Sequence, residues 1–145
     1  MRLNTCSEGI SYARELEQAS AALYEEAAAQ YPEVADTLRG YAAANKKNVS
    51  NVERAYYGVI TDAIEGCFAF DLDPDEYSID ATLPEGTALP EFYSRVIAME
   101  EIIDRFYIDA AEQSKGLMAD VPRAFNLVAK KRGQRVEELK SRASA

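Results

Sequence analysis

Apolar and small residues recur at intervals of three and four along most of this chain, in four long segments. This interval places them on one side of an α-helix, whereas a half-buried strand needs alternation at every second residue. Nothing in the chain alternates for long enough to predict a sheet, so we expect an all-α fold. The predicted helices cover Ser7–Tyr31, Pro32 to about Phe68, Leu89 to about Gly116, and Asp120 to about Arg142.

The connections between these segments predict how the helices are arranged. Pro32 suits the first turn of a helix and disfavours helix in the residue before it, so the first two helices should meet in a tight antiparallel turn. A short link also joins the third helix to the fourth. Residues 69–88 have no helical period, and a connection of this length should cross from one end of the molecule to the other. We therefore expect a single domain over residues 1–145, an antiparallel four-helix bundle with one long crossover between the second and third helices.

Composition limits the partners and mechanisms open to the chain. A formal net charge of −9 argues against nucleic acid or an anionic membrane as the main partner, because both bind basic surfaces. We expect a cytoplasmic protein, since no segment has the pattern of a membrane span or a signal peptide. The absence of histidine excludes Ser-His-Asp triads and every histidine-containing metal site. Cys6 and Cys67 form no Cys-x-x-Cys pair that could hold zinc or a rubredoxin-type iron.

Several polar and charged side chains fall on the apolar faces of the predicted helices. They are Glu17, Asn45, Asn48, Glu100, Arg132 and Arg135. The two halves of the chain also repeat one pattern. Glu17 stands seven residues before Tyr24, Glu100 stands seven residues before Tyr107, and the sequences around the two pairs are similar. This repetition indicates an internal duplication of a helix pair.

The duplicated pattern resembles the rubrerythrin branch of the ferritin-like superfamily, over about residues 7–142. In that family two helices each supply one Glu and the other two each supply Glu-x-x-His, and together they hold two irons in the bundle core. The resemblance places Glu17 and Glu100 at the single-Glu positions. The Glu-x-x-His motifs correspond to Asn-Lys-Lys-Asn at 45–48 and Arg-Gly-Gln-Arg at 132–135, so four of the six ligand positions have changed. The resemblance also places Tyr24 and Tyr107 beside the site, where core packing with a hydroxyl bonded to a carboxylate explains them, and implies a homodimer paired through an outer face.

The residues that now occupy these four positions are poor ligands for iron. Two ferrous ions bring four positive charges, which four carboxylates neutralise in the family, and this chain keeps two of them. Arg132 and Arg135 are permanent cations without a lone pair, so they would repel a metal ion. Their charges instead match those of Glu17 and Glu100. We predict no metal, no cofactor and a buried network in which the guanidinium groups form bidentate pairs with the carboxylates, while the two asparagines of the second helix satisfy the remaining polar atoms.

The biological role stays open between three classes of function. The leading hypothesis is a non-catalytic binding or interaction protein that has kept the fold and lost the iron chemistry. The alternative is a metal-binding ferritin-like oxidoreductase, of peroxidase or ferroxidase type, in which carboxylates such as Glu53 or Glu101 are recruited to an altered site. A third possibility is a small-ligand sensor that uses the polar core as an anion pocket. The acids at 71–76 resemble the start of a calcium loop but lack its turn glycine, which favours a solvated connection.

Overall fold

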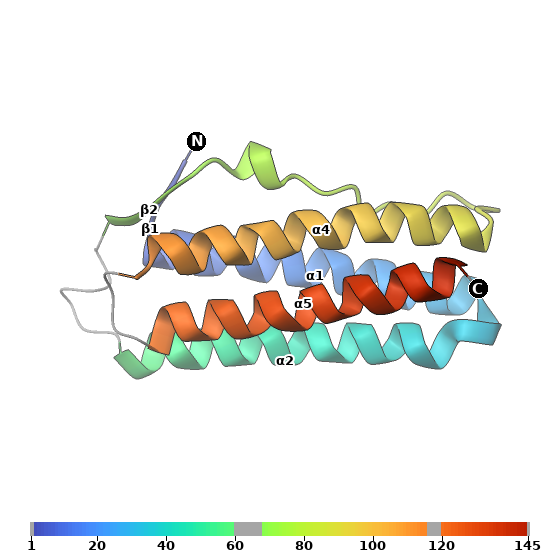
Figure 1. Ribbon diagram of the computed structural model, residues 1–145, viewed down its shortest axis with the longest axis horizontal. Coiled ribbons are helices and arrows are strands. Elements are labelled where there is room, and N and C mark those ends of the chain that lie inside the picture. The colour runs from blue at the N-terminus through green and yellow to red at the C-terminus, as the bar shows by residue number, and fades with distance from the viewer. Residues whose placement is uncertain (1, 60–67, 116–119, 145) are drawn as a thin grey trace.

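Long α-helices dominate the protein. The computed structural model describes residues 2–59, 68–115 and 120–144, and Figure 1 shows them as an elongated helical bundle. In this part of the chain the helices are four, each of 25 residues. They are α1 (Cys6–Gln30), α2 (Ala35–Val59), α4 (Leu89–Gln113) and α5 (Asp120–Ser144). The predicted helical fold class is therefore confirmed, and so is the number of helices within the described residues.

Local sequence explains where the first two helices begin and end. Thr5 and Glu8 form a capping box: the Thr5 hydroxyl accepts from the Glu8 amide at 3.1 Å, and the Glu8 carboxylate accepts from the Thr5 amide at 2.9 Å. Tyr31 leaves the helical conformation before Pro32, and a 3₁₀ turn, η1 (Pro32–Val34), leads directly into α2. The chain thus reverses over a few residues, as the proline predicts.

A small antiparallel sheet, which we did not predict, joins the two ends of the first half. Strand β1 (Leu3–Thr5) pairs with β2 (Phe68–Leu72), with Leu3 opposite Leu72 and Thr5 opposite Phe68. The expectation that no sheet forms is therefore wrong. The predicted end of the second helix near Phe68 falls next to residues 60–67, which lie outside the described residues, and Phe68 itself begins the strand. Strands of three and five residues are too short to show an alternating pattern, and their partners are distant in sequence.

The predicted crossover is confirmed. After β2, the chain passes through a 3₁₀ turn, η2 (Pro74–Tyr77), and runs in extended form along the bundle to the start of α4 (Figure 1). The Tyr12 hydroxyl of α1 donates to the carbonyl oxygens of Pro74 and Tyr77, at 3.0 and 3.2 Å. At the far end the Tyr31 hydroxyl donates to the Thr87 carbonyl at 2.5 Å. The crossover is therefore anchored to α1 at both ends.

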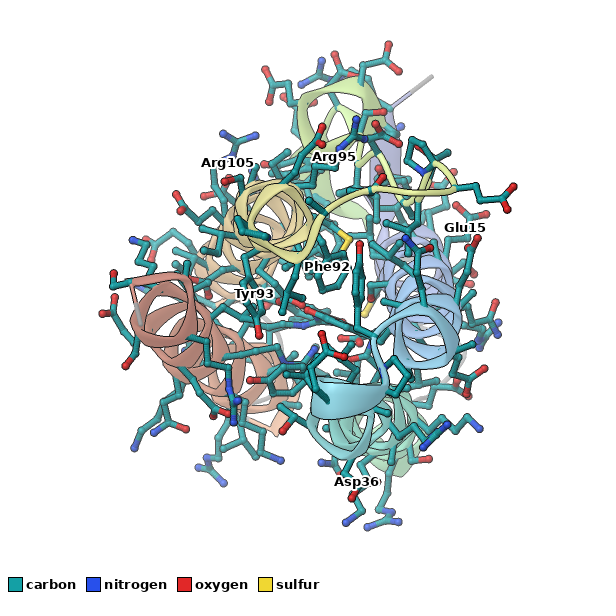
Figure 2. All side chains as sticks on the ribbon, turned by 90° about the vertical axis from the view of Figure 1, so that its right-hand side faces the viewer. Glu15, Asp36, Phe92, Tyr93, Arg95 and Arg105 are labelled. Carbon is teal, nitrogen blue, oxygen red and sulfur yellow. The ribbon has the colours of Figure 1, made fainter. Side chains whose placement is uncertain are left out.

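Seen along its axis, the bundle has its helices in the cyclic order α4, α1, α2, α5, with the crossover outside α4 and α1 (Figure 2). The chain order pairs α1 with α2 and α4 with α5 as two hairpins, and α2 packs on α5. Phe92 points into the centre, whereas Asp36, Arg95 and Arg105 point outward (Figure 2). Among the described helices, none combines the length and apolar character needed to cross a membrane.

Candidate functional site

The six polar residues that we predicted on the apolar faces are all buried, which confirms that part of the prediction. Glu17, Asn45, Asn48, Glu100 and Arg132 are at most 1% exposed, and Arg135 is 6% exposed. Each helix contributes at least one of them, so the set lies where all four helices face one another. Fully buried charges are rare in proteins unless they are paired, so their partners decide what this site can do.

Arg132 stands at the centre of the site and binds both carboxylates. Its Nη1 donates to both oxygens of Glu100, at 2.6 and 2.7 Å. Its Nη2 donates to Oε2 of Glu17 and, at 3.4 Å, to the Ser20 hydroxyl. One guanidinium from α5 therefore bridges carboxylates from α1 and α4.

Arg135 completes the charge balance one turn further along α5. Its Nη1 donates to Oδ1 of Asn45 at 2.8 Å and to Glu100 at 3.1 Å. Its guanidinium carbon also lies 4.7 Å from the Tyr41 ring centroid and 5.4 Å from that of Tyr24, within cation–π range. The predicted pairing of guanidinium groups with the carboxylates is therefore found, but only Arg132 contacts both oxygens of one carboxylate. One guanidinium serves both carboxylates, because Arg135 is held partly by an amide and two aromatic rings.

The two asparagines differ in how well they are bonded. The Asn45 amide donates to the Ser20 hydroxyl at 2.7 Å and to the Glu17 carbonyl at 3.1 Å, and its oxygen accepts from Arg135. Asn48 donates to the Glu17 carboxylate at 3.4 Å. Its Oδ1 has no hydrogen-bond partner within the described part of the chain, and neither has Nε of Arg132. The predicted role of satisfying the remaining polar atoms is thus confirmed for Asn45 and only partly met by Asn48.

The two tyrosines cross-link the duplicated halves. The Tyr24 hydroxyl of α1 donates to Glu100 of α4 at 2.5 Å, and the Tyr107 hydroxyl of α4 donates to Glu17 of α1 at 2.8 Å. Because α1 and α4 run antiparallel, a spacing of seven residues, about 10 Å along a helix, sets each tyrosine opposite the glutamate of the other half. We predicted hydroxyl–carboxylate bonds here, and the duplicated spacing is the signal that could have predicted their crossed pairing.

Two further residues, Ser20 and Tyr41, belong to the network although we did not predict them as site residues. The Ser20 hydroxyl accepts from Asn45 and Arg132 while donating to the Leu16 carbonyl at 2.8 Å. The Tyr41 carbonyl accepts from Arg135 at 3.4 Å. Both lie on apolar stripes within four residues of a predicted site residue, and that position was the available signal.

The electrostatics of the two glutamates differ. Burial raises the pKa of Glu17 above its ordinary value, and the opposing charge of Arg132 and the Tyr107 hydrogen bond offset this only in part. Burial also acts on Glu100, but Arg132 and Arg135 outweigh it and leave the pKa of Glu100 below its ordinary value. For Arg132 the two carboxylates likewise outweigh burial, so its pKa is raised. Glu100 is therefore the firmly ionised member, and Glu17 is the carboxylate that protonates more readily.

This donor set does not fit a pair of iron ions. The space between Glu17 and Glu100 is filled by a guanidinium, which binds carboxylates and offers no electron pair to a metal. Over the described ranges, no group of three or more His, Cys, Asp and Glu side chains could hold a metal ion. The carboxylates proposed as recruited ligands lie elsewhere: Glu53 pairs with Arg14 at 3.0 Å, and Glu101 lies 3.8 Å from Lys140.

A groove of about 330 Å³ between α1 and α2 passes close to the network. Its lining residues are Glu17, Gln18, Ala21, Ala22, Glu25, Asn45, Lys46 and Val49. At its rim Lys46 lies 3.9 Å from Glu25. The amide of Asn45 is already bonded on both its nitrogen and its oxygen, so the polar groups that the groove offers a ligand are mainly the exposed side chains of Gln18, Glu25 and Lys46.

The acids of the crossover also have structural partners. Arg2 binds Asp71 at 2.5 Å and lies 3.9 Å from Asp73, and the Asp73 carboxylate accepts from the Asp75 amide at 3.0 Å, which caps η2. These contacts agree with the prediction that this segment is an acidic, solvated connection.

Comparisons with protein-family models, with curated proteins and with solved structures found no match to this chain.

Proposed function

We propose that this chain is a rubrerythrin-like, ferritin-like four-helix bundle without a di-iron site, which serves as a non-catalytic binding or interaction protein. The observation that carries the proposal is the fully buried guanidinium of Arg132, bonded to both Glu17 and Glu100. In the family pattern these two glutamates would be iron ligands. Here they neutralise an arginine from the same chain.

The chemistry of the site supports a structural role for its charged residues. Two carboxylates face two guanidinium groups, so the core is formally neutral without any added ion. Catalysis needs a reactive group that a substrate can reach, and these side chains are buried and bonded to one another. The surface of the bundle is then what can recognise a partner, including a second copy of the chain.

Iron loading tests the proposal directly. Protein purified without oxygen and incubated with ferrous iron should retain none after desalting, as measured by elemental analysis, because the ligand positions carry cations and amides. About two equivalents of bound iron per chain would contradict the loss of the site. About one equivalent would favour the alternative function, a metal-binding oxidoreductase with an altered site.

Restoring the family ligands tests the resemblance itself. A variant with Asn45→Glu, Asn48→His, Arg132→Glu and Arg135→His has the complete set of four carboxylates and two imidazoles. We expect it to bind iron and to become coloured in air. If the variant folds, by circular dichroism, and still binds no iron, the residue-by-residue match to the family is wrong.

A matched control carries the same new residues on the outside of the bundle. Lys47→Glu with Ser50→His, and Lys131→Glu with Gln134→His, keep the three-residue spacing on the same two helices at exposed positions. This control should bind no iron, because its side chains do not converge. Equal iron binding by both variants would show that binding does not depend on the bundle core.

A further inference from the structure

The four helices differ strongly in charge. Helix α1 carries five acidic residues and one basic residue, and α4 carries six acidic and two basic. Helix α2 carries two acidic and four basic residues, and α5 carries three acidic and seven basic. Two of the α5 cations, Arg132 and Arg135, are the buried ones, yet its surface still keeps an excess of basic residues. A chain with a net charge of −9 thus contains two basic helices.

In the folded protein, basic residues gather on one side of the molecule and acidic residues gather on the opposite side. The basic helices α2 and α5 pack on each other, and the acidic crossover lies outside α4 and α1, away from α2 (Figures 1 and 2). The two arginines of α4 turn toward that crossover: Arg95 lies 3.6 Å from Asp80, and Arg105 donates to the Glu76 carbonyl. Arg95 thereby lies close to a carboxylate of that side, whereas Arg105 stays exposed there without a carboxylate partner among the described residues.

Each side exposes charges that have no counter-ion of their own. On α2 and α5 we define the basic face as Lys47, Arg54, Lys130 and Lys131, which are exposed and have no ion pair with any described residue. On the crossover we define the acidic ridge as Asp75, Glu76 and Glu85, which are exposed and likewise have no ion pair within the described ranges. Lys47 lies at the middle of α2, and Lys130 and Lys131 lie near the middle of α5, which packs on α2 and runs antiparallel to it (Figure 1).

We propose that the basic face of one copy binds the acidic ridge of a second copy. The charges of the two surfaces are complementary. Because they lie on opposite sides of one molecule, a pair formed this way leaves one basic face and one acidic ridge unused. Such head-to-tail contacts do not close into a dimer and produce an open series instead. This inference rests on the interaction role proposed above but not on the loss of iron binding, so either can fail alone.

Charge screening makes this contact possible in spite of the net negative charge. A four-helix bundle is on the order of 20 Å across, since each helix with its side chains is about 10–12 Å wide. At about 0.1 M salt the screening length is about 10 Å. Repulsion between distant charges of two copies is then weak, whereas the facing surfaces still attract. Exposed ion pairs are individually weak, so the association should be reversible and sensitive to salt.

Sedimentation of the whole chain over a concentration series tests the inference. At about 0.1 M salt the average mass should rise with concentration past that of a dimer, and at about 1 M salt, where the screening length is about 3 Å, it should return to that of the monomer. A monomer under every condition would overturn the inference and leave the basic face to another acidic macromolecule. A closed dimer that is insensitive to salt would also overturn it, and would agree with the homodimer implied by the family resemblance.

Paired charge reversals give the sharper test. One variant carries Lys47→Glu, Lys130→Glu and Lys131→Glu, so that both of its sides are acidic. The other carries Asp75→Lys, Glu76→Lys and Glu85→Lys, so that both of its sides are basic. All six positions are exposed and none belongs to the buried network, so both variants should fold.

Each variant alone should stay monomeric at about 0.1 M salt, and an equimolar mixture of the two should associate again. The mixture is also the control for net charge, because it contains the same altered residues as the two single-variant samples that are expected not to associate. Association of either variant alone, or a mixture that stays monomeric, would overturn the proposed pairing of faces.

Discussion

At the scale of single residues, the stability of this core depends on each buried charge keeping its oppositely charged partner. Transferring two ions out of water costs about as much as their attraction returns, so a buried pair adds little by itself. Removing one partner leaves the other charge buried and unbalanced. Arg132 is the most sensitive position because it is the sole residue that binds both Glu17 and Glu100 through its Nη atoms in the described network.

The first prediction compares adjacent arginine and lysine positions. Arg132→Ala should lower the free energy of unfolding by about 3–5 kcal/mol, because it leaves two buried carboxylates without their shared cation. Its neighbour Lys131 is exposed, and Lys131→Ala should change stability by about 0.5 kcal/mol or less. Urea unfolding of both variants measures the difference. Similar values for the two would mean that the Arg132 charge is not buried in solution.

The second prediction distinguishes the two glutamates. At neutral pH, Glu100→Gln should destabilise the protein more than Glu17→Gln, because Glu100 binds both arginines and has a lowered pKa, whereas burial raises the pKa of Glu17. The two substitutions keep side-chain volume and remove one charge each, so each is the control for the other. Denaturant midpoints in the reverse order would contradict the assigned roles.

The third prediction concerns acid. A carboxyl whose pKa is lowered by folding contributes stability that is present above its ordinary pKa and is lost as pH falls through its folded value. Glu100 is of this kind. The pKa of Glu17 is raised, so Glu17 acts in the opposite sense: the stability that it contributes to the protein is lost as pH rises through its folded pKa. Below about pH 4, the ordinary range of Glu, stability should fall more steeply in the natural chain than in Glu100→Gln. Parallel slopes for both chains, from unfolding at several pH values, would contradict this.

At the scale of elements, the β1–β2 sheet depends on one close approach. A Cβ added at Gly9 of α1 would lie 2.5 Å from the ring of Phe70 in β2, so an alanine there cannot fit unless the buried Phe70 ring moves. Gly40 of α2 has nothing within 4 Å of the corresponding position. Glycine is otherwise unfavourable inside a helix relative to alanine by about 0.5–1 kcal/mol. The two glycines should therefore respond to alanine in opposite directions.

The fourth prediction follows from this contrast. Gly40→Ala should raise the free energy of unfolding by about 0.5–1 kcal/mol, and Gly9→Ala should lower it, because overpacking typically costs about 1–3 kcal/mol. Thermal or urea unfolding gives both values from one pair of variants. A stabilising Gly9→Ala would mean that β2 does not pack on α1 in solution.

At the scale of the whole molecule, the polar network links the two hairpins. Helices α1 and α4 are joined by the crossed Tyr–Glu bonds and the guanidinium between them, and also by packing of Tyr12 on Phe106, whose ring centroids lie 5.4 Å apart. The network therefore contributes to how the two hairpins are positioned relative to each other. Whether it also supplies net stability is a separate question, because matched apolar sets can replace buried ion pairs without loss.

The fifth prediction addresses that question. Replacing the four charged residues together, with Glu17→Leu, Glu100→Leu, Arg132→Met and Arg135→Met, should leave stability unchanged or raise it by about 1–4 kcal/mol. Circular dichroism and urea unfolding test this, with Arg132→Ala as the unpaired comparison. Loss of cooperative unfolding in the fully apolar variant would instead show that the ion pairs are needed to specify the packing of the bundle.

Sequence alone was sufficient for the four helices and for the six charged and amide members of the buried network, although not for Ser20 and Tyr41. Helices depend on contacts between residues three and four apart, so their apolar faces are visible in the chain, and Glu17, Asn45 and Arg132 are conspicuous as polar residues on those faces. Charge matching between the arginines and glutamates could also be read without a structure. For the same reason the crossover was predictable from its lack of helical period.

Contacts between distant residues were decided by the tertiary structure. The pairing of Leu3 with Leu72, the crossed bonds of Tyr24 and Tyr107, and the choice of one arginine to serve both glutamates depend on how the helices are offset and rotated. Local periodicity carries no information on those offsets, because the same stripes allow several packings. Side-chain volume and the geometry of hydrogen bonds select one arrangement, and they act only after the hairpins have come together.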